Sequence, residues 1–68
     1  MKDYNYIKAR WERACERYLD SEGAYPDEAR IEMWFLCEAL EDILELPSGS
    51  SSERVRELAE ERRKGIVA

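Results

Sequence analysis

The chain has 68 residues, of which 40% are charged and 44% hydrophobic, with no histidine and a formal net charge of −5. This length allows one domain whose core supplies only about 3–5 kcal/mol, while the hydrophobic fraction excludes a chain that is disordered throughout. We find no signal-peptide pattern and no apolar run of about 18 residues, so we expect a cytoplasmic protein without a membrane span.

Apolar residues at spacings of three and four predict a first helix over residues 4–21. They are Tyr4, Ile7, Trp11, Ala14 and Tyr18. We expect Asp3 to cap this helix at its N-terminus and Gly23 to end it in a left-handed conformation. Of the first two tyrosines, we place Tyr4 in the core and expect Tyr6 to be exposed.

A second helix is expected over residues 26–46, because Pro26 suits a first turn and Pro47 cannot continue a helix. Its main apolar stripe holds Met33, Leu36, Leu40, Ile43 and Leu44. If the two helices form an antiparallel hairpin about Gly23, the numbers of facing residues add to about 51. The stripe then faces the first helix, and the two cysteines, Cys15 and Cys37, become neighbours.

The second helix has more apolar side chain than one stripe needs. Trp34 and Phe35 point away from the stripe, and Trp34 falls near Glu38, Glu41 and Glu45 by the advance of about 100° per residue. The cover for these rings is the third helix, a second copy of the chain, or a foreign partner. The sequence leaves these three alternatives open.

Residues 47–52 are rich in proline, glycine and serine, and we interpret them as a linker. Ser50 and Glu53 have the spacing of a capping box, which predicts a third helix over residues 51–64. Its apolar face is thin, with Val55 and Leu58 as the main members. We therefore expect a shorter, weaker helix, and its arginines would meet the acids around Trp34 if it covers that ring.

The residue types argue against catalysis and metal binding. Without histidine the chain lacks the most frequent general base and metal ligand, and its three glycines stand singly, so no phosphate-binding loop is present. Two cysteines can neither build a disulfide framework nor complete a four-ligand zinc site. We interpret them as reduced thiols in the core, with a cross-helix disulfide formed on oxidation as the alternative. We expect no enzyme activity, no cofactor and no metal.

Negative charge is concentrated on the second helix. Between Pro26 and Leu46 seven acids face one base, Arg30, for a net charge of −6. This field argues against direct nucleic-acid binding and favours a protein partner with a basic surface, although surface acids also serve solubility alone. Because tryptophan is enriched at binding hot spots, we predict a partner-binding site made of Trp34, Glu38, Glu41, Asp42 and Glu45.

The sequence thus predicts an all-α fold, an antiparallel two-helix hairpin plus a shorter third helix, as a small three-helix bundle that is either monomeric or dimerised. The preferred function is a small acidic regulator or inhibitor, of the type that phages and mobile elements encode, which binds a basic surface of a nucleic-acid-handling protein or complex. The alternative is a structural or assembly protein whose spare apolar surface is used in a symmetric homo-oligomer.

Overall fold

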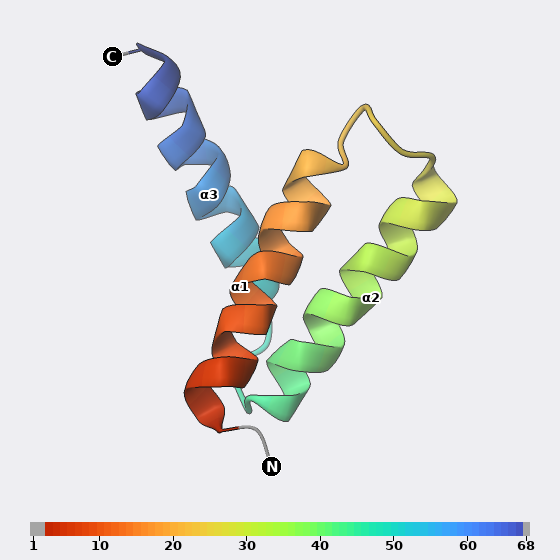
Figure 1. The fold of residues 1–68 in the computed structure, drawn as a ribbon, viewed down its shortest axis with the longest axis vertical. Helices are drawn as coiled ribbons and strands as arrows, with labels where there is room; N and C mark the ends of the chain where they lie inside the picture. The colour runs from red at the N-terminus through yellow and green to blue at the C-terminus, as the bar shows by residue number, and fades with distance from the viewer. Residues whose placement is uncertain (1–2, 68) are drawn as a thin grey trace.

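The computed structural model describes residues 3–67 and contains three helices (Figure 1). These are α1 (Tyr4–Asp20), α2 (Asp27–Ile43) and α3 (Ser50–Val67). Figure 1 shows α1 in the middle of the view, with α2 on one side and α3 on the other. The predicted all-helical fold with three packed helices is confirmed. Within the described residues, no helix is long and apolar enough to cross a membrane.

The three helices form a flat assembly of 40 × 30 × 21 Å. One helix with its side chains is about 10–12 Å wide, so the shortest extent is about two helices thick. The buried apolar core is correspondingly small and holds Trp11, Ala14, Cys15, Cys37, Leu44 and Leu58. Each helix therefore keeps a broad face toward solvent.

Of three predictions for the first helix, those for Asp3 and Gly23 are confirmed and the one for Tyr4 is wrong. Asp3 Oδ1 accepts a hydrogen bond from the Tyr6 amide at 2.8 Å and so caps the helix. Gly23 follows the helix with φ 78°, a left-handed conformation that costs glycine little. Tyr4, however, is 52% exposed rather than part of the core; it is the first residue of α1.

The face that α2 buries differs from the predicted stripe. Cys37 and Leu44 are buried, whereas Leu36 is 44% exposed and Ile43 is 62% exposed. The buried face is thus turned by up to one residue's advance, about 100°, relative to the prediction. The physical reason is α3, whose first turn is hydrogen-bonded to the side of α2 that holds Cys37 and Glu41.

The end of α2 also comes before the predicted residue 46, since the helix stops at Ile43. Glu45 has φ 58°, and the Leu46 amide donates to the Glu41 carbonyl at 3.1 Å. This pattern is a Schellman motif, in which glycine usually fills the left-handed position that Glu45 holds here. Helix α2 therefore ends through its own backbone hydrogen bonds, before the chain reaches Pro47.

The predicted capping box of α3 does not form. The Ser50 hydroxyl donates to the Pro47 carbonyl at 2.6 Å, and the Glu53 amide bonds to a backbone carbonyl instead of to Ser50. The cap comes from another helix, because Glu41 Oε1 accepts a hydrogen bond from the Ser51 amide at 2.7 Å. With 18 residues α3 is the longest helix rather than the expected shorter one.

Ser51 joins the three helices inside the core, where it is 1% exposed. Its hydroxyl accepts a hydrogen bond from Trp11 Nε1 at 2.8 Å and donates one to the Cys37 carbonyl at 3.3 Å. Together with the bond from its amide to Glu41, these contacts tie the first turn of α3 to both other helices. We refer to this set of hydrogen bonds as the Ser51 junction.

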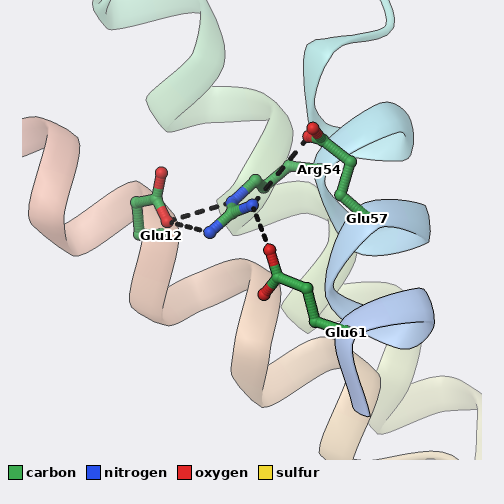
Figure 2. A network of polar contacts seen from close by, with 4 residues as sticks. All are labelled: Glu12, Arg54, Glu57 and Glu61. Carbon is green, nitrogen blue, oxygen red and sulfur yellow. Dashed lines mark hydrogen bonds and ion pairs between the residues drawn. The ribbon is translucent and has the colours of Figure 1, made fainter. Parts of the chain in front are cut away.

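An arginine network holds α3 against α1 beyond this junction (Figure 2). The Arg54 guanidinium reaches Glu12 Oε2 on α1, at 2.9 Å from Nη2 and 3.0 Å from Nε. Two acids of α3 itself, Glu57 and Glu61, lie 3.9 and 3.8 Å from Nη1. One cation is therefore shared by three carboxylates on two helices.

A second ion pair links the same two helices further along, between Arg62 of α3 and Asp20 of α1. The sequence predicts that the arginines of the third helix meet the acids around Trp34 if that helix covers the ring; the structure shows them paired with other acids. The acids of these two pairs belong to α1 and not to the group around Trp34.

The Ser51 junction predicts an uneven response to serine substitution. Ser51→Ala leaves the buried Trp11 indole N–H without an acceptor and should lower the free energy of unfolding by about 1–3 kcal/mol. Chemical denaturation measures this change. The matched control is Ser52→Ala, an exposed neighbour on the same turn, which should stay within about 0.5 kcal/mol. Equal effects at the two serines would contradict the role of the junction.

The left-handed conformation of Glu45 predicts a stabilising substitution. A side chain costs about 1–2 kcal/mol in this region, whereas glycine loses only about 0.5–1 kcal/mol through its greater freedom when unfolded. Glu45→Gly should therefore raise the free energy of unfolding by about 0.5–1 kcal/mol. The same change at Glu38, inside α2, should lower it by about 1 kcal/mol; a loss of stability at both positions would contradict this interpretation of the helix end.

Candidate functional site

The structure divides the five predicted site residues into two groups. Trp34 and Glu41 are partly buried and make contacts within the bundle, whereas Glu38, Asp42 and Glu45 are exposed. The five side chains therefore do not present one continuous surface to a partner.

Trp34 is covered by the first helix. Its ring lies against Tyr18, with centroids 4.9 Å apart and planes inclined at 51°. The Arg30 guanidinium carbon lies 4.6 Å from the centre of the same Tyr18 ring, and Arg30 Nε donates to Ser21 Oγ at 3.0 Å. The neighbouring ring of Phe35 is 63% exposed, so of the two aromatic rings only Trp34 is placed inside the bundle.

Glu41 is engaged by the Ser51 junction. One of its carboxylate oxygens accepts the Ser51 amide at 2.7 Å, and the residue is partly buried between the helices. A carboxylate at the N-terminus of a helix is stabilised by the free amides and by the helix dipole. Glu41 thus has a structural role, and the acids available for an external contact lie elsewhere on α2.

Exposed apolar and acidic side chains share the outer side of α2. Ile31 and Phe35 are four residues apart, as are Glu38 and Asp42, so each pair lies along the helix on adjoining rows. Ile31 is 51% exposed, and within residues 3–67 neither acid forms an ion pair. We call these four residues, with Glu45 just beyond the helix end, the α2 outer surface.

A different surface lies between α1 and α2. An open groove of about 510 Å³ is lined by Tyr6, Arg10, Arg13 and Arg17 of α1 and by Leu36 and Leu40 of α2, among others. A neighbouring hollow of about 260 Å³ shares Arg17 and Leu36 and adds Glu32 and Met33. Among the described side chains, none from α3 lines either hollow. We call this surface the α1/α2 groove.

The arginines of the α1/α2 groove form a row that the sequence did not identify as a site. Arg10, Arg13 and Arg17 are all exposed, and among the described residues none of them forms an ion pair. Their spacings of three and four place them on one side of the helix. That spacing was the available signal, and it was hidden because Glu12, Glu16 and Asp20 offset most of the positive charge of α1.

Cys15 and Cys37 are neighbours, as predicted, and both are fully buried and free of a disulfide. Hydrogen bonding with the Cys37 side chain, together with burial, raises the pKa of Cys15 well above its usual range. A nucleophilic or redox-active cysteine needs an accessible thiolate. The pair thus has the environment of core side chains.

This environment predicts slow thiol modification in the native protein. At neutral pH a soluble disulfide reagent should react with the folded chain at least about 100-fold more slowly than with the denatured chain, because local or global opening must come first. Spectrophotometry of the released thiolate gives both rates, and full modification in denaturant is the control. Rapid reaction of the native protein would contradict the buried placement.

A comparison of the chain with known protein families, curated proteins and solved structures finds no match. The α2 outer surface and the α1/α2 groove are therefore the features from which a function is inferred.

Proposed function

We propose that this chain is a small non-catalytic regulator that binds a basic surface of another protein through the α2 outer surface. The observation that carries the proposal is the exposure of Ile31 and Phe35 next to Glu38 and Asp42, acids that have no internal partner within the described residues. Protein interfaces combine an apolar centre with a polar rim in this way.

Phe35 is the anchor in this proposal. It is 63% exposed, whereas Trp34 already packs on Tyr18. Burying an exposed phenylalanine side chain contributes about 1.5–3 kcal/mol, and exposed aromatic rings on a small acidic protein otherwise lower its solubility. In this proposal Phe35 therefore takes the place of Trp34 as the aromatic anchor of the binding site.

Glu38, Asp42 and Glu45 supply the electrostatic part of the contact. Unpaired carboxylates attract a lysine- or arginine-rich surface, raise the rate of encounter and penalise acidic competitors. Since these charges are exposed, the attraction is screened by salt over a Debye length of about 8–10 Å. Binding should accordingly weaken as ionic strength rises.

The proposed mechanism is steric and electrostatic occupation. Proteins that handle nucleic acids carry basic surfaces for phosphate, and an acidic helix seated on such a surface would block it without any chemical step. The proposal treats α1 and α2 as an antiparallel hairpin that presents this helix. The order of contacts Cys15 with Cys37, Tyr18 with Trp34 and Ser21 with Arg30 supports that arrangement.

Partner capture by variants of the α2 outer surface tests the proposal. The immobilised full chain is exposed to extract of its source organism, and captured proteins are identified by mass spectrometry. Phe35→Ala should weaken capture of a basic protein about 10- to 100-fold, and Glu38→Lys with Asp42→Lys should abolish it at moderate salt. Melting temperatures should change little, because all three positions are exposed.

The matched control reverses two exposed acids on the other helices, Glu16→Lys with Glu60→Lys. This variant has the same net charge as the α2 double variant and should capture the partner as the parent chain does. Equal loss in both double variants would show a general charge effect, and the proposed site would then be rejected.

A further inference from the structure

The α1/α2 groove has one basic wall and one apolar wall. Arg10, Arg13 and Arg17 supply three positive charges from α1 that have no ion-pair partner among the described residues, while Leu36 and Leu40 line the opposite side from α2. Double-stranded nucleic acid is bound mainly through its phosphates and gives the leucines nothing to pack on. The occupant that fits both walls is an amphipathic helix with an apolar stripe bordered by acids.

The chain itself contains such a helix. On α2, Glu28, Glu32 and Leu36 follow one another at a spacing of four and so share one row. Ile43 lies seven residues after Leu36, on the same side of the helix, and is 62% exposed. The groove side of α2 therefore presents acids at its beginning and apolar side chains along the rest.

The exposed area points to an interface of ordinary size. A monomer of 8.0 kDa is expected to expose about 4,450 Å², whereas this chain exposes 5292 Å². The excess of about 800 Å² is close to what each partner buries in a standard protein interface. Because the bundle is thin and its core is small, burying the exposed side chains of the α1/α2 groove in an interface would add to its stability.

We infer that a second copy of the chain covers the α1/α2 groove in a two-fold symmetric dimer. The α2 helices of the two copies lie side by side through Leu36 and Ile43, and the arginine row of each copy meets Glu28 and Glu32 of the other. Because a two-fold contact is self-complementary, each apolar stripe and each set of ion pairs occurs twice. Glu38 and Asp42 stay outside this contact.

The first test is the mass of the full chain in solution with its thiols reduced. Sedimentation equilibrium over a wide concentration range should give a dimer in equilibrium with monomer. Leu36→Asp places a charge in the apolar seam and should weaken the dimer at least about 10-fold, while circular dichroism should show an intact helical fold because Leu36 is 44% exposed in the single chain. A wild-type chain that stays monomeric throughout would overturn the inference.

A charge-exchange series tests the surface itself. Arg13→Glu with Arg17→Glu should weaken the dimer at least about 10-fold, and Glu28→Arg with Glu32→Arg should do the same, since each puts like charges face to face. The chain that carries all four changes should regain the parent's dimer constant. This recovery is expected only if the two sets of residues meet across the interface.

The control is Glu16→Arg, an exposed site on α1 outside the groove lining, which should leave the dimer constant unchanged. A dimer that none of the groove variants weakens would place the contact elsewhere and overturn the inference, as would a four-change chain that remains monomeric. A monomer whose groove instead binds polyglutamate or a short oligonucleotide would overturn it in favour of a foreign occupant. The inference does not rest on the proposed function, because the two use different surfaces and separate measurements.

Discussion

The hydroxyl of Ser51 is the point at which the three helices meet, since it accepts a hydrogen bond from the Trp11 indole and donates one to the Cys37 carbonyl. Buried polar groups must be paired, so this contact sets which face of each helix turns inward. Cys37 is drawn toward α3 as a result, and Leu36 and Ile43 are left toward solvent. The open apolar surface of α2 thus follows from how a polar group in the core is satisfied.

Features that depend on local periodicity or on one residue's conformational preference were predictable from the sequence. The three helices, the Asp3 cap and the left-handed Gly23 belong to this group. The Cys15–Cys37 contact was predictable as well, from the sequence positions of facing residues in a hairpin. Ser51 was not predictable, because nothing distinguishes it from the serines beside it and its bond to Trp11 spans 40 residues of sequence.

For the candidate site, too, only the local features were predictable from the sequence. The acidic and apolar positions of α2 can be read from the sequence, but the direction in which each one faces depends on the neighbouring helices. Glu41 turns inward because it accepts the amide of Ser51 at 2.7 Å, and Trp34 turns inward because it packs on Tyr18.

The arginine row of α1 also depends on a neighbouring helix. Arg54 and Arg62 of α3 pair with Glu12 and Asp20 of α1, which leaves α1 with a positive side and, within the part of the chain that the structure describes, leaves most acids of α2 without an ion pair.

The cap that Glu41 provides makes the ordering of α3 depend on α2. An isolated helix of this length is marginal in water, and the first turn of α3 gains its carboxylate acceptor only once α2 has formed. The ion pairs from α3 to α1 likewise need α1 in place. The helical state of α3 is therefore coupled to the folded state of α1 and α2, which supply its cap and its ion-pair partners.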